Sequence, residues 1–195
     1  MNQKTKKMVG VGLLTAIIVV LQSLAAIIPV GIFNLNLVLV PIVVGAALYG
    51  VAAGAWLGFV SAMMILFTNA GAFLAVSVIG TIITVLGKGI GSGLVAGLVY
   101  QALKKVNLNL SVICAAIVCP VVNTAVFLLG CWLFFLPTIT GWGEAWAAST
   151  GKASFSVVEY MLVGLVGTNF LIELAISIVL SSTIVRIVQI GKSGR

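Results

Sequence analysis

The sequence contains no histidine and no aspartate, and its only acidic residues are three glutamates. Charged residues account for 7% of the 195 positions, whereas soluble domains usually have about 25%. A soluble globule needs a charged surface, and 10 basic and 3 acidic side chains are too few to provide one. Residues of the apolar class instead make up 62% of the chain. The sequence therefore predicts an integral membrane protein.

The same absences limit the chemistry that the chain can perform. Without histidine or aspartate, most general bases, metal sites and activated nucleophiles have no residues to build them. The three cysteines, Cys114, Cys119 and Cys131, fall in one apolar segment without metal-ligand spacing. The sequence thus predicts no catalytic residues, no metal and no cofactor. The net charge of +7 comes from basic residues at segment ends, which indicates membrane topology and no nucleic-acid partner.

Long, continuous apolar runs predict an all-α, multi-pass membrane protein with a single domain over residues 1–195. A membrane-spanning helix needs about 20 mostly apolar residues, so the apolar content suffices for about six. The predicted spans cover roughly residues 8–28, 37–49, 53–67, 74–103, 111–135 and 155–188. The second is short for a full span, and residues 137–154 are predicted to form the longest loop.

The distribution of basic residues predicts the orientation. Six spans place both termini and the 104–109 turn on one side of the membrane, which then carries eight of the ten basic residues. The opposite side carries only Lys152, and Lys88 lies within a span. Because lysine and arginine concentrate on the cytoplasmic side, both termini are predicted to be cytoplasmic. Merging the second and third spans would put the basic clusters on opposite sides, so five spans are rejected.

The fourth predicted span carries a polar stripe that includes the only deep cation. Ser77, Thr81, Thr84 and Lys88 are spaced at i, i+4, i+7 and i+11, and therefore share one face of a helix. A charge at mid-bilayer costs about 2.5–3.5 kcal/mol, so Lys88 requires an explanation. The stripe fits either helix–helix hydrogen bonds with an ion pair or the wall of a cavity with a cationic anchor. The cavity is the preferred interpretation.

The sixth span offers a matching face. Glu159, Asn169 and Glu173 lie at i, i+10 and i+14, again on one side of a helix. They are interpreted as a second wall of the same cavity. Alternatively, either glutamate serves only to neutralise Lys88, which is a common structural arrangement between spans.

The fifth span has two polar residues at mid-depth, Asn123 and Thr124, shortly after Pro120. A proline inside a helix frees a backbone carbonyl. Asn123 is therefore interpreted either as a ligand contact or as a partner for that carbonyl. The ligand contact is the preferred interpretation.

Glycines crowd the fourth span. They are Gly87, Gly89, Gly91, Gly93 and Gly97. The Gly87–Lys88 pair is not a phosphate-binding loop, because the position five residues before Gly87 is Ile82 and Gly89 replaces the required Ser or Thr. We therefore predict no nucleotide site, and expect the glycines to allow close helix packing. Gly12 and Ala16 give the first span a similar small-residue surface.

The chain as a whole resembles the substrate-binding S-component of an energy-coupling-factor (ECF) vitamin transporter. The resemblance lies in the six spans, the Asn34–Asn36 stretch after the first span, and three passages. These are "LVLVPIVVGAALYGVAAGAWLGFVSA", "GKGIGSGLVAGLVYQALKK" and "CPVVNTAVFLLG". The family has an Ala-xxx-Ala motif in the first helix for docking to the shared membrane subunit. Here the matching positions are Gly12 and Ala16.

The resemblance implies a mechanism and partners. A vitamin is held in a cavity built from spans four to six, open to the outside and covered by the loop after span one. The subunit then associates with a transmembrane coupling subunit and two ATPases in a prokaryotic plasma membrane, and topples to release its cargo. The chain itself is then not an enzyme, since the partners hydrolyse ATP.

The cargo is predicted from the polar groups. Lys88 favours a carboxylate or phosphate, and the amides and hydroxyls suit a ligand with hydroxyls and an amide. Pantothenate has these groups, and the "CPVVNT" region resembles pantothenate-type members. Phe127 and Trp132 keep pyridoxine or a thiazole as alternatives, and the predicted order is pantothenate, then pyridoxine, then riboflavin. A stand-alone small-solute transporter is the alternative class of function, and a membrane enzyme is the third.

The predicted site residues follow from the stripe, the matching spans and the resemblance. The predicted substrate-binding residues are Asn36, Ser77, Thr81, Thr84, Lys88, Asn123, Thr124, Phe127, Glu159, Asn169 and Glu173. The predicted partner-docking residues are Gly12 and Ala16.

Overall fold

The computed structural model describes residues 2–27, 37–152 and 155–193. Within these ranges the chain forms helices and no strand. In chain order they are α1 (Gln3–Ile27), α2 (Leu39–Tyr49), α3 (Val51–Thr68), α4 (Gly71–Leu74), α5 (Val78–Leu103), α6 (Leu108–Phe134), α7 (Leu136–Ser149), α8 (Val157–Glu159), the π-helix η1 (Tyr160–Leu165) and α9 (Gly167–Ser193). The prediction of an all-helical chain is therefore confirmed for the described residues.

Four helices in the described ranges, α1, α3, α5 and α6, are long and apolar enough to cross a membrane. A fifth span results if the bent α8–η1–α9 segment is counted as one. The sixth predicted span is represented by α2, which has only 11 residues and rises roughly 16 Å at 1.5 Å per residue. A hydrocarbon core is about 30 Å thick. The structure thus supports four or five full-length spans where six were predicted.

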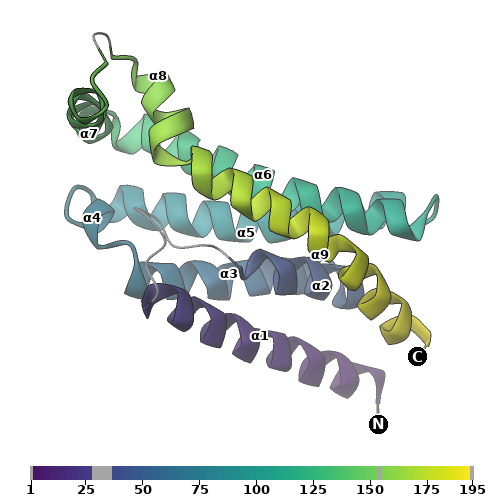
Figure 1. The fold of residues 1–195 in the computed structure, drawn as a ribbon. Coiled ribbons are helices and arrows are strands. Elements are labelled where there is room, and N and C mark those ends of the chain that lie inside the picture. The colour runs from purple at the N-terminus through teal and green to yellow at the C-terminus, as the bar shows by residue number, and fades with distance from the viewer. Residues whose placement is uncertain (1, 28–36, 153–154, 194–195) are drawn as a thin grey trace.

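The helices lie side by side with α5 in the middle. α5 contacts α3 on one side and α6 on the other, and α9 packs across α6 and α2. α1 lies at the edge of the bundle, against α3 and α2 (Figure 1). The turn from α2 to α3 needs glycine, since Gly50 has a φ of 97° that side chains rarely adopt.

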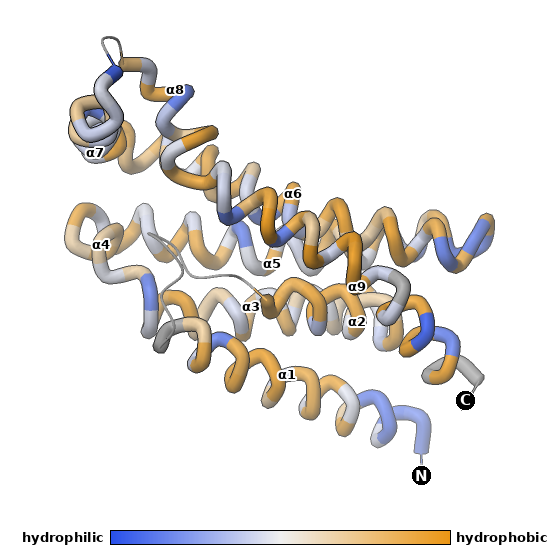
Figure 2. Tube along the Cα trace, in the orientation of Figure 1, coloured by the Kyte–Doolittle hydropathy of each residue, from blue (hydrophilic) through white to orange (hydrophobic). Residues whose placement is uncertain are grey.

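Both described chain ends lie at the same end of the bundle, together with the α5–α6 turn (Figure 1). Hydrophilic segments lie at this end, at the start of α1, the α5–α6 turn and the end of α9 (Figure 2). We call it the terminal end, and the end that carries α4, α7 and α8 the distal end. The bodies of the helices between the two ends are largely apolar, as expected for a lipid-facing surface.

α3 and α5 approach each other through glycines. A Cβ atom on Gly58 would lie 2.0 Å from the Gly89 carbonyl oxygen, and one on Gly54 would lie 2.6 Å from that of Gly93. Gly97 similarly faces the backbone of Val51. The prediction that glycines in the fourth span allow close helix packing is confirmed at three of its five positions. The other two, Gly87 and Gly91, face valine side chains of α6 at ordinary distances.

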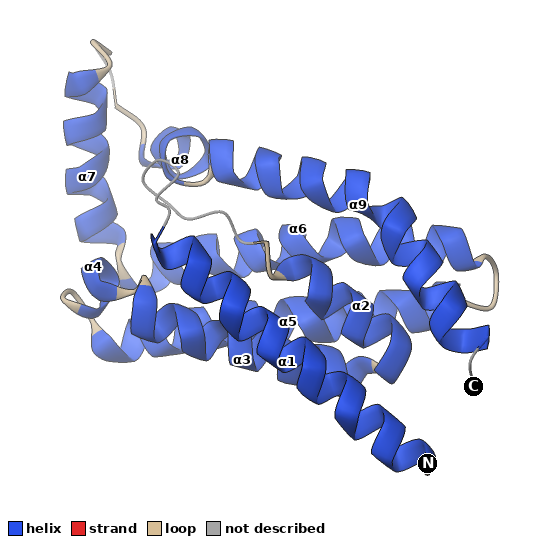
Figure 3. Cartoon of the chain, turned by 60° about the horizontal axis from the view of Figure 1, so that its bottom comes forward, coloured by secondary structure: helices blue, strands red, loops and turns tan. Residues whose placement is uncertain are grey.

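The prediction of a loop over residues 137–154 is wrong for its first part, which belongs to the helix α7. Pro137 occupies its first turn, where the missing N–H is tolerated. Ile139, Gly143 and Ala147 recur every four residues and are buried, so α7 presents one packed face to the molecule. α7 runs across the distal end of the bundle and not along it (Figure 3).

The last predicted span is not one straight helix. Its two parts, Val157–Leu165 and Gly167–Ser181, are bent by 46°, and the π-helix η1 precedes the bend. π-helical turns and breaks of this kind often occur at functional sites. Here Leu165 and Val166, which flank the bend, line a cavity.

Candidate ligand cavity

A cavity of about 120 Å³ lies between the distal halves of the helices. A single water needs about 10–15 Å³, so the space suits a small organic molecule. Its described lining residues come from α1, the α3–α4 region, α5, α6 and the η1–α9 region. They are Gln22, Ile65, Asn69, Ala70, Phe73, Thr81, Thr84, Val85, Lys88, Asn123, Thr124, Phe127, Phe135, Leu165, Val166, Asn169, Phe170 and Glu173.

Lys88 is the one cation, and Glu173 the one anion, among the described lining residues. The Lys88 ammonium lies 4.9 Å from the centre of the Phe127 ring, a distance typical of a cation–π contact. The Glu173 carboxylate acts electrostatically on Lys88 from α9. The cavity therefore combines a ring face with two opposite charges, and its cation has donors for an anionic ligand group.

Two asparagines face the cavity from different helices. Asn123 of α6 is 7% exposed, and Asn169 lies in the first turn of α9. Each amide offers two donors and an acceptor. Because α9 begins at Gly167 beside the cavity, the positive end of its helix dipole also lies there. Together with Thr124 of α6, these groups suit a polar ligand.

The two threonines of the α5 stripe differ in what their hydroxyls do. The Thr81 hydroxyl donates a hydrogen bond of 2.7 Å to the Ser77 carbonyl. The Thr84 hydroxyl has no partner among the described residues and packs against Gly130 of α6, where a Cβ atom would lie 2.2 Å away. Thr81 therefore contributes mainly its shape and methyl group, while the Thr84 hydroxyl is buried against Gly130 without a hydrogen-bond partner among the described residues.

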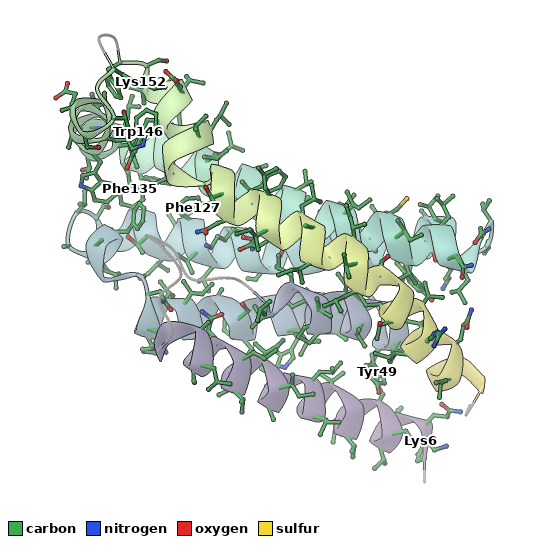
Figure 4. The ribbon with its side chains drawn as sticks, viewed as in Figure 1. Lys6, Tyr49, Phe127, Phe135, Trp146 and Lys152 are labelled. Carbon is green, nitrogen blue, oxygen red and sulfur yellow. The ribbon has the colours of Figure 1, made fainter. Side chains whose placement is uncertain are left out.

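Aromatic rings close the distal side of the cavity. The Phe73 ring makes edge-to-face contacts with Phe127, Phe135 and Trp142, at centroid distances of 5.7, 5.1 and 5.5 Å. Phe127 and Phe135 lie on the distal part of α6 and just after it, on the side toward α7 (Figure 4). The cluster joins α4, α6 and α7, so the helix that crosses the distal end is packed on the cavity wall.

Two predicted binding residues lie outside the cavity. Ser77 caps α5, since its hydroxyl accepts a hydrogen bond from the Gly80 N–H at 3.2 Å. Glu159 forms an ion pair with Lys152, whose ammonium also lies 4.7 Å from the centre of the Trp146 ring. Lys152 and Trp146 are at the distal end of the molecule, away from the terminal end (Figure 4).

The structure brings together the other predicted residues of spans four to six. Eight of them line the cavity: Thr81, Thr84, Lys88, Asn123, Thr124, Phe127, Asn169 and Glu173. Asn36 lies outside the described residues. Shared helix faces were sufficient to find the α5 and α9 members of this set, whereas Asn123 and Thr124 were predicted from their position after Pro120 and Phe127 from its ring.

Two polar lining residues were missed by the sequence analysis, Gln22 and Asn69. Gln22 lies in the first span, which was not expected to reach the cavity, and Asn69 lies in the turn after α3. Their side chains contact each other, with the Gln22 Nε2 donating to the Asn69 Oδ1 at 3.5 Å. The available signal was a single glutamine within an apolar run, since polar residues within a membrane are usually functional.

The predicted docking residues lie on the outer surface of α1. Both Gly12 and Ala16 are exposed, and a Cβ atom on Gly12 would meet nothing within 4 Å. Large apolar side chains around them, such as Leu13 at 64% exposure, share this surface. The surface is therefore open to lipid or to another helix.

These features define a class: a multi-pass membrane protein, helical over its described residues, with a small cavity lined by polar and apolar side chains. The model of the family described as ECF transporter, substrate-specific component, matches residues 6–188. The chain belongs to this family. Comparison with curated proteins and with solved structures gives no match.

Membership of this family establishes the general role of the chain. The chain is a transporter subunit and not itself an enzyme, and its family implies a small-molecule substrate and partners of the ECF module. The resemblance to ECF S-components drawn from the sequence is thus confirmed at the level of the family.

Proposed function

We propose that this subunit captures a water-soluble vitamin, with pantothenate as the preferred cargo. The proposal is supported by one observation: the Lys88 ammonium group and several side-chain amides and hydroxyls line the same cavity. Lys88 binds the carboxylate by a charge-assisted hydrogen bond. Asn123, Asn169 and Thr124 bind the hydroxyls and the amide.

The proposed orientation has the terminal end in the cytoplasm of a prokaryotic cell and the distal end outside. The support is the hydrophilic colour of the chain segments at the terminal end (Figure 2), which include Lys4, Lys104 and Lys105, together with the positive-inside rule. The cavity then lies in the outer half, where a vitamin enters from outside.

The proposed delivery requires partners. Gly12 and Ala16 on the exposed face of α1 dock to the transmembrane coupling subunit, and two ATPase subunits supply the energy. Small residues support this proposal, because they allow another helix to approach closely.

Pyridoxine and riboflavin are the alternative cargoes within the same function. The ring cluster around Phe127 and Phe73 favours a flat ligand, which supports pyridoxine as the second candidate. A stand-alone transporter is less well supported, because the described lining residues lie in the distal halves of the helices. Such a transporter needs a path through the whole membrane.

The test is the binding of pantothenate, pyridoxine and riboflavin to the detergent-purified chain, measured by calorimetry. Tight binding of pantothenate by the isolated chain is the expected result. Binding of one of the others changes the cargo and keeps the function. Absence of binding with all three, combined with uptake in vesicles without ATPase subunits, contradicts the proposal.

A further inference from the structure

The helix α1 was not expected to contribute a residue to the cavity lining. It lies at the edge of the bundle, against α2 and α3, and most of its side chains are at least partly exposed. Gln22 is the exception among its polar residues, since it is 4% exposed and lines the cavity. Of the described lining residues, Gln22 is the only one that α1 provides.

The side-chain amide of Gln22 is only half used. Its Nε2 donates to the Asn69 Oδ1, and Asn69 also accepts a hydrogen bond from the Thr68 hydroxyl. The Gln22 Oε1 is buried and has no hydrogen-bond partner among the described residues. A buried polar atom without a partner costs stability, so such atoms in native proteins call for an explanation.

Packing does not explain why this residue is a glutamine. A methionine of similar shape would fill the same position and would leave no unpaired oxygen. Asn69 already accepts from Thr68, and its contact with Gln22, at 3.5 Å, is long for a hydrogen bond. The unpaired acceptor is therefore the feature that distinguishes glutamine from an apolar residue here.

We propose that Gln22 is a specificity-determining residue of the cavity, whose amide oxygen accepts a hydrogen bond from a hydroxyl or amide N–H of the cargo. The proposal rests on the proposed function of the cavity. It adds a requirement that Lys88 does not impose: the cargo carries a donor at its α1 side, in addition to an anionic group near α5. The Gln22 amide acts directly on the cargo.

The proposal makes the discrimination between ligands the decisive quantity. A site built to bond a hydroxyl or N–H rejects the analogue that lacks it, because a buried acceptor is then left unpaired. Wild-type protein will thus bind one donor-lacking analogue more weakly than it binds the parent vitamin. A variant without the Gln22 acceptor will bind this analogue and the parent vitamin with similar affinity. A residue with a merely structural role would weaken all ligands to the same extent.

The experiment uses the full chain in detergent and two variants, Gln22→Met and the control Gln101→Met. Gln101 is an exposed residue of α5 near the terminal end, so the control makes the same chemical change away from the cavity. The probes are pantothenate and three analogues, each lacking one donor through removal of either hydroxyl or N-methylation of the amide. Pyridoxine and its deoxy analogues are compared in the same way.

The expected result for Gln22→Met is a roughly five- to hundredfold weaker binding of the parent vitamin, since the vitamin's donor loses its buried partner. Discrimination against one analogue disappears at the same time. The control keeps wild-type affinity and discrimination. Thermal unfolding of the ligand-free Gln22→Met variant occurs at the wild-type temperature or above, which shows that it is folded.

Two outcomes overturn the proposal, and they are distinguishable. If wild-type protein binds a vitamin and Gln22→Met keeps the discrimination between parent and analogues, whether its affinity is unchanged or equally weaker for all ligands, Gln22 does not determine specificity and the proposed function stands. If wild-type protein binds neither vitamin nor any analogue, the proposed function fails and the assignment of Gln22 fails with it.

Discussion

On one side of α5, the helix α3 approaches so closely that Gly58 faces the carbonyl of Gly89 without space for a methyl group. Around Lys88 of the same helix, residues of α6 and α9 line a cavity together with Gln22 of α1 and the α3–α4 region. At the packed contact, glycines bring the two helix backbones together, whereas the cavity is lined in part by the bent η1–α9 segment. One helix thus joins a tightly packed contact to the candidate ligand cavity, so the α3–α5 pair forms a support for one wall of that cavity.

The largest effect is expected on the exposed face of α1, the helix that packs against α3. Substitutions there should reduce transport and leave ligand binding unchanged. Gly12→Leu or Ala16→Leu should abolish uptake in cells that contain the ECF module, because a bulky side chain blocks the approach of another helix. Vitamin binding to the purified variants should remain unchanged, since both positions are exposed. Uptake assays and calorimetry test the two statements. The control is Ala125→Leu, an exposed position of α6; uptake that persists in both α1 variants places docking elsewhere.

The next effect concerns the tightly packed contact itself. Gly58→Ala should destabilise the protein by about 3 kcal/mol, the upper part of the range for overpacking, because its methyl group would lie 2.0 Å from a backbone oxygen. Gly91→Ala is the matched control on α5, where the added atom would lie 3.9 Å from a Val122 methyl group. Thermal unfolding in detergent compares them. Equal stability of the two variants would show that the α3–α5 contact is not rigid.

On the cavity side, Lys88→Ala should weaken pantothenate by about 1.5–3 kcal/mol, the range for a hydrogen bond with a charged group. A neutral ligand should lose less. Calorimetry with the purified variant measures the change, and Lys152→Ala, outside the cavity, should bind as wild type does. Undiminished binding by a correctly folded Lys88→Ala variant would remove this lysine from the site.

The smallest effect is expected at the ion pair that joins residue 152 to α8. Both partners are about two-fifths exposed, and such pairs contribute about 0–1 kcal/mol. Glu159→Gln should therefore lower the thermal stability slightly, and the difference from wild type should shrink as salt is added. Vitamin affinity should not change. A large loss of affinity would contradict the placement of Glu159 outside the cavity.

The sequence was sufficient to predict which helix faces meet at the cavity, because spacing alone decides which side chains share a face. Thr81, Thr84 and Lys88 on α5, and Asn169 with Glu173 on α9, line the cavity as their spacing indicated. Spacing does not show where a stripe ends. Ser77 continues the α5 stripe but lies at the first turn, where its hydroxyl caps the helix.

Features that depend on contacts between distant segments were not predictable in the same way. α7 contains Pro137 and two glycines within a moderately polar stretch, which favours a loop, yet it is a helix packed against neighbours such as Phe155 and Tyr160 at Gly143. The bend after Leu165 has no proline to mark it. Gln22 reaches the cavity only because the distal end of α1 lies near Asn69.

The ring cluster gives the protein an internal optical probe. The Trp142 indole contacts the Phe73 ring, and Phe73 lines the cavity, so a single phenyl ring separates a fluorophore from the cavity. Trp56 lies on α3, on the opposite side of α5 from α6. Replacing the other three tryptophans with phenylalanine would leave a single emission that reports on the occupancy of the cavity and on the packing of α7, without any attached dye.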